Sequence, residues 1–284
     1  MITETQKTWF ITGASKGFGF EITKAALEAG DKVVATVRNN GSALYTSLEQ
    51  DANLFVVEMD VTKESEVKAA VEKAIDHFGK LDIVVNNAGY GIVGAIEEVS
   101  DAEARKQYDT NVFGVLNVLR ATLPLLRKQR SGHVINVSSL FAFDPLTGWA
   151  LYGSTKNAVE GISQGLVKEL EPFGISVSVI EPGLFRTGFT GRSSYVVAQN
   201  AIGDYENTMV GAMRNGTDTY HGSQPGDPSK LAAVVVKLGH TENPPLHLPI
   251  GTDSINNYNI YTKKLENDVN NWMKDALSTD YNSN

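Results

Sequence analysis

Hydrophobic and polar residues follow two alternating patterns along the first two thirds of the chain. Short apolar runs predict buried strands, and they occur at residues 9–11, 32–37, 54–58, 81–85, 133–137 and 176–180. Longer segments with apolar residues three and four positions apart predict amphipathic helices, at residues 17–29, 42–50, 63–78, 102–126 and 150–170. This alternation predicts right-handed βαβ units and a parallel sheet with helices on both faces.

The alternation stops after Gly183. Residues 187–228 are rich in Gly, Ser, Asn, Asp and Tyr, with a weak helical pattern near 196–213. Such a segment is either a surface insertion or a lid over a substrate. The remaining segments are a helix at 227–238, a strand at 245–250, a helix at 258–277 and a polar tail at 278–284. No repeat or linker divides the chain, so we expect one doubly wound, Rossmann-type α/β domain of about seven strands over residues 1–284.

Composition excludes several classes of protein. The net charge of −8 disfavours nucleic-acid binding. The absence of cysteine excludes disulfides and thiolate metal sites, and five scattered histidines leave little for a metal, so we expect none. No basic region with a following apolar run opens the chain, and no stretch approaches the ~18–20 apolar residues of a membrane span. We therefore expect a soluble, cytoplasmic protein without a membrane or nucleic-acid partner.

The first strand is followed by the glycine-rich turn Thr12-Gly13-Ala-Ser-Lys-Gly17-Phe-Gly19. Its spacing is G-x-x-x-G-x-G and not the G-x-G-x-x-G fingerprint. A turn between a strand and a helix exposes backbone N–H groups that bind a pyrophosphate, and side chains would block that approach. The turn predicts a dinucleotide site, with a plain tight turn as the alternative.

Tyr152 and Lys156 lie four residues apart on a predicted helix and so share one face. A neighbouring cation favours the phenolate and lowers the pKa of a tyrosine. Such a tyrosine can donate a proton to a carbonyl oxygen or remove one from an alcohol. Alone, the pair is more often part of an exposed helix face, and Ser139 and Asn111 are unremarkable singly.

Taken together in order, these motifs resemble the short-chain dehydrogenase/reductase family over residues 7–251. The segment after Gly226 is similar to that of hydroxysteroid- and retinol-dehydrogenase-like members and of bacterial carbonyl reductases. The resemblance implies that Tyr152 is the general acid and base, and that Lys156 lowers its pKa and binds the nicotinamide ribose. It further implies that Ser139 holds the substrate oxygen and that Asn111 positions Lys156 and a water.

The resemblance also implies a set of cofactor-binding residues. Asp60 and Val61 would meet the adenine, Asn87 to Gly89 the adenosine, and Phe185 and Thr187 the nicotinamide. The full set is Gly13, Ser15, Lys16, Gly17, Phe18, Gly19, Arg38, Asp60, Val61, Asn87, Ala88, Gly89, Tyr152, Lys156, Pro182, Gly183, Phe185 and Thr187.

The end of the second predicted strand bears on the choice of cofactor. An NAD site usually has an acidic residue there for the ribose 2′-OH, whereas this chain has Val37-Arg38-Asn39. Arg38, together with Lys16 from the glycine turn, would pair with a 2′-phosphate. This predicts NADP(H), unless both side chains are simply solvated.

Apolar and aromatic residues flank the catalytic motifs. They predict a hydrophobic ketone or aldehyde as substrate, although each residue could also be ordinary packing. The substrate-binding candidates are Tyr90, Phe141, Trp149 and Leu184, with Phe143 and Phe185 beside them. The insertion adds Phe189, Tyr195, Tyr205, Met209, Met213 and Tyr220.

The sequence also bears on two alternative functions, a hydrolase and a redox sensor, and on the oligomeric state. Residues 161–165 match the G-x-S-x-G elbow of hydrolases, but that motif needs a strand before its serine and Ser163 falls within a predicted helix. A redox sensor that binds NADP without turnover has no reason to keep Ser139, Tyr152 and Lys156 at catalytic spacing. Family members are commonly dimers or tetramers, so the resemblance implies a homo-oligomer through the helices at 102–126 and 150–170.

Overall fold

A seven-stranded parallel sheet forms the centre of the protein, seen in a computed structural model that describes residues 6–48, 51–187, 194–216 and 222–281. The strand order is β3-β2-β1-β4-β6-β7-β9. The strands are β1 (Thr8–Ile11), β2 (Lys32–Val37), β3 (Leu54–Glu58), β4 (Ile83–Asn86), β6 (Gly132–Val137), β7 (Ile175–Pro182) and β9 (His247–Ile250). The predicted fold, a doubly wound parallel sheet, is confirmed.

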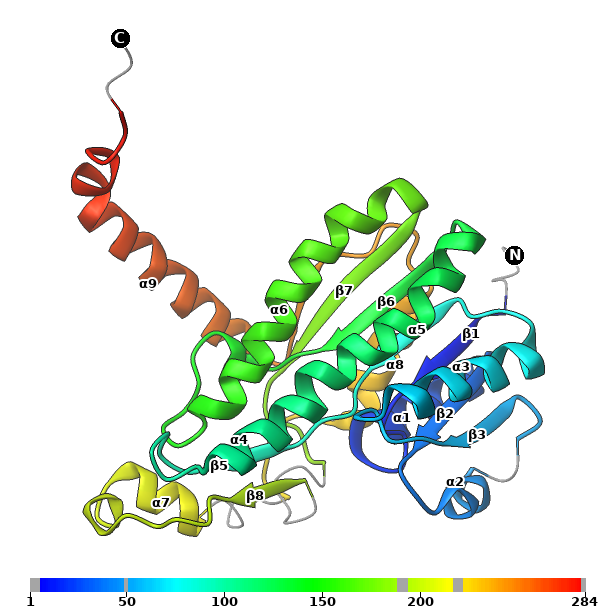
Figure 1. Ribbon diagram of the computed structural model, residues 1–284, viewed down its shortest axis with the longest axis horizontal. Helices are drawn as coiled ribbons and strands as arrows, with labels where there is room; N and C mark the ends of the chain where they lie inside the picture. The colour runs from blue at the N-terminus through cyan, green and yellow to red at the C-terminus, as the bar shows by residue number, and fades with distance from the viewer. Residues whose placement is uncertain (1–5, 49–50, 188–193, 217–221, 282–284) are drawn as a thin grey trace.

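Helices cover both faces of this sheet (Figure 1). On one face α1 (Gly17–Glu28) and α8 (Pro228–Gly239) pack against each other, with α2 (Gly41–Ser47) at the sheet edge. On the other face lie α3 (Glu64–Phe78), α5 (Gly114–Gln129) and α6 (Ala150–Leu170). Trp9 and Phe10, consecutive residues of β1, are fully buried in the two opposite layers. This is why the strands read as continuous apolar runs and not as alternating ones.

The predicted helix over 102–126 is interrupted in the structure. It consists of α4 (Asp101–Tyr108), a π-helical turn η1 (Asp109–Phe113) and α5. A π turn accommodates about one residue more than an α turn and is frequent at functional sites. The apolar period continues across it, so the hydrophobic pattern does not distinguish it from a regular helix.

The insertion after β7 contains more structure than its composition indicates. β8 (Tyr195–Val197) pairs in parallel with β5 (Gly91–Val93), forming a second small sheet that the hydrophobic pattern did not predict. The short 3-10 turn η5 (Gly203–Tyr205) and α7 (Met209–Gly216) follow. Arg214 of α7 forms a buried ion pair with Glu98, which fastens the insertion to the body. Phe189 and Tyr220 lie outside the described residues.

The long helix α9 (Thr252–Leu277) follows β9. Its first turn packs beside β9, and the rest projects away from the body (Figure 1). The sequence pattern predicted this helix from residue 258; it begins earlier, directly after Gly251, whose positive φ of 104° ends the strand.

Candidate active site

One large cavity opens at the carboxyl ends of the parallel strands. Its volume is about 950 Å³, and it is lined from the glycine turn at one end to the insertion at the other. In an open α/β sheet ligands bind outside the carboxyl ends of the strands, where the strand order reverses. Here the order reverses between β1 and β4, whose following loops both line the cavity.

The glycine turn is built as a close-packed cradle. Gly13 and Gly17 have φ values of 69° and 57°, which favour glycine. A Cβ on Gly19 would lie 2.6 Å from Asn87 Nδ2 and nearer still to the carbonyl oxygen of Gly13. The turn therefore requires these glycines for its conformation and for the packing of α1 against the strand before it.

Thr12 joins the ends of β1 and β4. Its hydroxyl oxygen accepts hydrogen bonds from the backbone N–H groups of Asn87 and Ala88, both at 3.0 Å. In return Asn87 Nδ2 donates to the carbonyls of Thr12 at 2.8 Å and Gly13 at 3.1 Å. These bonds fix the Asn87–Gly89 segment beside the glycine turn, as a shared binding surface requires.

Two cations lie together at the end of β2. Lys16 and Arg38 both line the cavity. Partial burial, and then the charge of Arg38, lower the pKa of Lys16. Asp60 also lines the cavity; burial acts to raise its pKa, but hydrogen bonds from Thr62 and the Arg38 charge outweigh it and lower that pKa. The described residues thus place a local positive site in a protein of net charge −8.

Tyr152, Ser139 and Lys156 come together at the centre of the cavity. Tyr152 is hydrogen-bonded to Ser139. Lys156 Nζ lies 5.7 Å from the centre of the Tyr152 ring and donates to the carbonyl oxygen of Val137 at 2.8 Å. Burial lowers the pKa of Lys156 to about 8, while the charge of Glu160 acts against that shift.

The pKa of Tyr152 differs from the expectation. Burial raises it, and the hydrogen bond with Ser139 offsets this only in part. Lys156 is not among the groups that shift the pKa of Tyr152 in this structure. Tyr152 is therefore a protonated phenol here, which suits a proton donor.

Asn111 sits in the π turn and acts through the backbone of Tyr90. Its Oδ1 accepts from Tyr90 N at 3.1 Å, and its Nδ2 donates to Tyr90 O at 2.9 Å and to Thr155 Oγ1 at 3.0 Å. The expected role of Asn111 in positioning Lys156 and a water stays a prediction. Gln107, which was not predicted from the sequence, donates a further hydrogen bond to Tyr90 O at 3.0 Å.

The loop after β7 forms a wall of the cavity and contacts the glycine turn. The rings of Phe185 and Phe18 meet edge to face, with centroids 5.4 Å apart. Asp253 at the start of α9 accepts a hydrogen bond from Leu184 N at 2.6 Å and lies so close to Gly183 that no side chain fits there. Asp253 was not predicted from the sequence, because its role depends on a contact between residues 69 positions apart.

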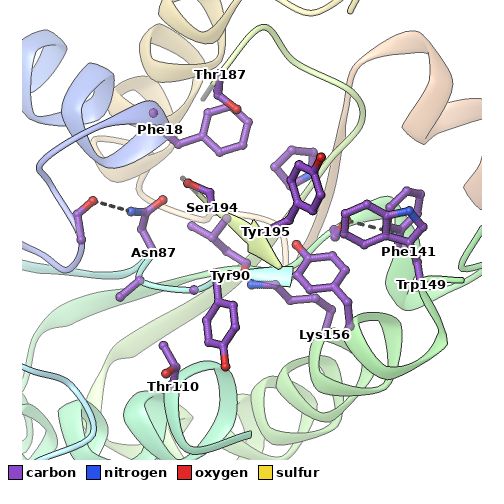
Figure 2. Close-up of a pocket in the computed structure, with 18 of the residues that line it drawn as sticks. Phe18, Asn87, Tyr90, Thr110, Phe141, Trp149, Lys156, Thr187, Ser194 and Tyr195 are labelled. Carbon is purple, nitrogen blue, oxygen red and sulfur yellow. Dashed lines mark hydrogen bonds between the residues drawn. The ribbon is translucent and has the colours of Figure 1, made fainter. Parts of the chain in front are cut away.

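Aromatic side chains surround the other end of the cavity. Phe141, Trp149, Tyr152 and Tyr195 belong to one buried cluster, with Leu184 and Met213 packed against it. Figure 2 shows Phe18 and Asn87 at one end, Phe141 and Trp149 at the other, and Lys156 and Tyr195 between them. The strand β8 and the helix α7 thus bring the insertion over the site.

Most of the predicted site residues line this cavity. Gly19 and Asn111 do not, since both act from behind it through backbone contacts. Phe143 and Tyr205 lie elsewhere. Phe143 packs on Tyr258 and Tyr261 of α9, and the hydroxyl of Tyr205 donates to Glu97. The members that the structure brings together are Gly13, Ser15, Lys16, Gly17, Phe18, Arg38, Asp60, Val61, Asn87, Ala88, Gly89, Tyr90, Ser139, Phe141, Trp149, Tyr152, Lys156, Pro182, Gly183, Leu184, Phe185 and Thr187.

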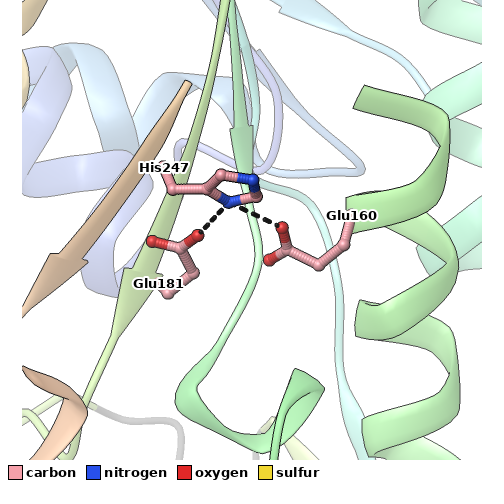
Figure 3. A group of neighbouring side chains, drawn as sticks. All are labelled: Glu160, Glu181 and His247. Atoms are coloured by element: carbon pink, nitrogen blue, oxygen red, sulfur yellow. Dashed lines mark hydrogen bonds and ion pairs between the residues drawn. The ribbon is translucent and has the colours of Figure 1, made fainter. Parts of the chain in front are cut away.

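Two buried acids and a half-buried histidine come together behind the cavity (Figure 3). Nδ1 of His247 on β9 is 3.0 Å from Glu181 of β7 and 3.4 Å from Glu160 of α6. Burial raises the pKa of Glu160 to about 7 and that of Glu181 to about 8. Because Glu160 is one helical turn beyond Lys156, this group adds to the electrostatic environment of the site.

Ser163 is a structural residue. It lies inside α6, is fully buried, donates to Val159 O at 2.7 Å and accepts from Asn136 at 2.8 Å. The strand–turn–helix geometry of a hydrolase elbow is therefore absent at this position.

A Rossmann-type sheet with a glycine turn and a Tyr–Lys pair at one cavity defines a dinucleotide-dependent oxidoreductase. Residues 7–195 match the short chain dehydrogenase family, and the chain belongs to that family. It is 38% identical to "Oxidoreductase BOA17" of Botryotinia fuckeliana over 88% of this chain and 90% of that one. It is 35% identical to a 3-ketodihydrosphingosine reductase of Bacteroides thetaiotaomicron over 85% and 86% of the two chains.

Solved structures similar to this chain agree with the assignment to this family. A short-chain dehydrogenase from Streptomyces avermitilis has a TM-score of 0.89 and 34% identity, covering 98% of this chain and 100% of that one. A 3-ketoacyl-(acyl-carrier-protein) reductase from Brucella melitensis complexed with NADH has a TM-score of 0.72 and 27% identity over 87% and 98%. ElxO with NADP bound has a TM-score of 0.69 and 26% identity over 87% and 97%.

These findings place the protein among the dehydrogenases and reductases that interconvert CH–OH and C=O groups with a nicotinamide dinucleotide. Within the described part of the chain, no helix combines the length and apolarity needed to cross a membrane.

Proposed function

We propose that the protein is an NADP(H)-dependent carbonyl reductase acting on a hydrophobic ketone or aldehyde. The observation that carries the proposal is the position of Tyr152, between the cationic, glycine-lined end of the cavity and its aromatic end. One end fits a phosphorylated dinucleotide and the other an apolar substrate, so the carbonyl oxygen would lie at the phenol.

The dinucleotide end fits NADP(H) on two grounds. Gly13 and Gly17 of the glycine turn line the cavity, so a phosphate can approach the backbone there without meeting a Cβ from either residue. Lys16 and Arg38 provide two positive charges at the end of β2, where an NAD site would have an acid. A 2′-phosphate on the adenosine ribose would pair with both.

When bound, a reduced nicotinamide cofactor would supply the hydride that the carbonyl carbon needs. Tyr152 donates its phenol proton to the carbonyl oxygen, which completes the alcohol. Ser139, hydrogen-bonded to Tyr152, holds that same oxygen. The Lys156 ammonium, 5.7 Å from the ring centre, stabilises the phenolate left behind. The phenol of Tyr152 is protonated, which is the form that reduction of a carbonyl uses.

The apolar end supports a substrate with a sizeable hydrophobic body. Phe141, Trp149 and Tyr195 form its walls, and Met209 and Met213 of α7 lie over it. Methionine adapts its shape to irregular ligands. The reductase of Bacteroides thetaiotaomicron described above, named for a ketone, agrees with this substrate class.

The test is NADPH oxidation with a panel of aryl ketones, steroids, retinal and sugars, in the parent and in Tyr152→Phe. We expect turnover of the apolar carbonyls and a fall in kcat of about 10²–10⁴-fold in the variant, because the proton donor is lost. NADPH binding, followed by fluorescence, should be retained.

Three outcomes of this assay would contradict parts of the proposal or favour the alternative function. Near-normal rates in Tyr152→Phe contradict the catalytic assignment. NADPH binding without turnover of any carbonyl favours a redox sensor. Equal kcat/KM with NADH and NADPH contradicts the cofactor proposal alone.

A further inference from the structure

The insertion after β7 supplies one wall of the aromatic end of the cavity. Tyr195 and Val196 of β8 line the cavity, together with Met209, Ala212 and Met213 of α7. The three α7 residues are spaced three and four positions apart and therefore share one face of the helix. A substrate that fills this end of the cavity meets these side chains, so the placement of α7 decides which substrates fit.

A fully buried glutamate of the body contacts the insertion. Glu98 lies in the turn between β5 and α4 and has no exposed surface. Its Oε2 accepts a hydrogen bond from Ala95 N in the same turn at 2.9 Å. Its Oε1 accepts from Ile202 N of the insertion at 2.9 Å and from the guanidinium of Arg214. A buried carboxylate is stable only with such partners, so Glu98 ties the insertion to the turn in which it lies.

Arg214 fixes the orientation of α7 about its own axis. Its side chain is 5% exposed, and its guanidinium lies between two carboxylates, with Nη1 on Glu98 and Nη2 at 2.7 Å from Glu206 Oε2. Because the guanidinium is planar and its donors have fixed directions, this contact restrains the helix more strictly than a point charge would. Met213 is the preceding residue and Met209 lies one turn earlier, so a rotation of α7 would move both methionines relative to the cavity.

Two further polar contacts join the insertion to the body nearer to the solvent. The hydroxyl of Tyr205 donates to the exposed Glu97, and Gln199 N donates to Glu103 Oε1 at 3.1 Å. Exposed polar pairs contribute little to stability, whereas removing one partner of a buried ion pair leaves an uncompensated charge. The placement of α7 therefore depends most on the buried pair of Glu98 and Arg214.

We propose that Glu98 and Arg214 are specificity-determining residues of the reductase, which act by positioning α7 and its methionines over the aromatic end of the cavity. The inference rests on the proposed function and names what selects the substrate at that same site. Within the described residues neither side chain lines the cavity, so both act through α7 and not on substrate, cofactor or Tyr152.

The effect of this pair depends on the size of the substrate. A bulky apolar carbonyl needs α7 in place, and its apparent affinity falls with the fraction of molecules in which α7 is in place. A small carbonyl can reach Tyr152 and Ser139 without contacting α7. It should therefore be reduced equally well when α7 is displaced.

The variant Arg214→Met tests the proposal, since it removes the charge and keeps a long side chain. The probes are 2-acetylnaphthalene as bulky ketone and propanal as small aldehyde, each with saturating NADPH. We expect the KM for 2-acetylnaphthalene to rise by about tenfold or more, because α7 is in place in fewer molecules. Its kcat, the kcat/KM for propanal and the Kd for NADPH should all stay within about threefold of the parent values.

Two other variants separate positioning from a general structural role. Arg105→Met is the matched control, because Arg105 forms an exposed ion pair with Asp101 on α4, and it should leave both substrates unaffected. Arg214→Lys should restore part of the preference for the bulky ketone, because lysine keeps the charge but not the fixed donor directions. A merely structural role would lower kcat for both substrates alike and leave their ratio unchanged.

Glu98→Gln covers the case in which Arg214→Met does not fold, since glutamine keeps the size of the side chain and an oxygen acceptor. We expect the same rise in KM for 2-acetylnaphthalene, with faster amide hydrogen exchange over residues 195–216. Circular dichroism reports whether each variant is folded.

Several results would overturn the inference. One is an unchanged ratio of kcat/KM for the two substrates in folded Arg214→Met or Glu98→Gln. Another is a parent that does not prefer 2-acetylnaphthalene to propanal. Loss of folding in both variants would assign the pair to stability alone. A parent that reduces neither carbonyl contradicts the proposed function itself, and this inference with it.

Discussion

At the scale of single residues, the cofactor end of the cavity depends on two side chains of the same charge. Lys16 and Arg38 lie close enough for one charge to lower the pKa of the other, an arrangement that an anion would relieve. In a chain of net charge −8 such a pair is a local exception. Two neighbouring positive charges of this kind suit the binding of a phosphate group.

Replacing Arg38 by alanine tests this role. Because a hydrogen bond to a charged group contributes ~1.5–3 kcal/mol, we expect kcat/KM for NADPH to fall by about 10–100-fold in Arg38→Ala. The value for NADH should change little. Steady-state kinetics with both cofactors measures the two effects.

Arg127→Ala is the matched control, since this arginine is exposed in the last turn of α5, away from the cavity. An equal loss with NADH and NADPH in Arg38→Ala would indicate a general structural effect and contradict the 2′-phosphate role.

Some residues of the candidate site could be predicted from the sequence and others could not. Tyr152 and Lys156 could be predicted because their spacing on one helix places them together without knowledge of the fold. Asp253 could not, since its contact with Leu184 arises only when β9 pairs with β7. Gln107 was missed for the same reason: its role appears only once α4 lies beside the backbone of Tyr90.

At the scale of elements, the turn between β1 and α1 is the most constrained. The Gly19→Ala variant would push its Cβ into the carbonyl of Gly13 and the amide of Asn87. We expect it to weaken NADPH binding by more than about tenfold and to lower the Tm, because backbone must move and the cost of overpacking is ~1–3 kcal/mol. Fluorescence titration and thermal melts measure both.

Gly165→Ala supplies the control at this scale. Gly165 lies in α6, and a Cβ added to it would meet nothing within 4 Å in the described structure. Alanine there should stabilise the protein by up to ~1 kcal/mol and leave the kinetics unchanged. If Gly19→Ala behaved like Gly165→Ala, the cradle would not depend on close packing.

The elements differ in how well pattern could predict them. The inner strands of the large sheet, such as β1 and β4, are buried throughout, so their apolar runs stand out. The strands β5 and β8 have only three residues each, and Val196 and Val197 of β8 are exposed, so no pattern marks them. Their pairing is a tertiary contact between residues about a hundred positions apart.

At the scale of the whole molecule, the acids behind the cavity make stability depend on pH. Burial raises the pKa of Glu181 from 4.5 to about 8 in the folded protein. The folded state therefore holds a proton that the unfolded chain releases. The stability contributed in this way is fully present below about pH 4.5 and is lost as the pH rises through about 8.

Glu181→Gln should remove this dependence while keeping an oxygen acceptor for His247. As the pH is raised from 5 to 9, we expect the Tm of Glu181→Gln to rise by several degrees relative to the Tm of the parent. Thermal melts across that range measure it. Glu169→Gln, an exposed glutamate on the same helix as Glu160, should leave the slope unchanged. Parallel Tm curves for the parent and Glu181→Gln would contradict the prediction.

The π turn at Asp109–Phe113 has a consequence for changes of chain length. Deleting one residue there would let α4 and α5 merge into a single regular helix, and the part before the deletion would rotate by about 100°. Gln107 and Asn111 could not then both reach the backbone of Tyr90. This stretch should therefore tolerate many substitutions at its exposed positions yet no loss of a residue, so that during evolution its length is held more strictly than its composition.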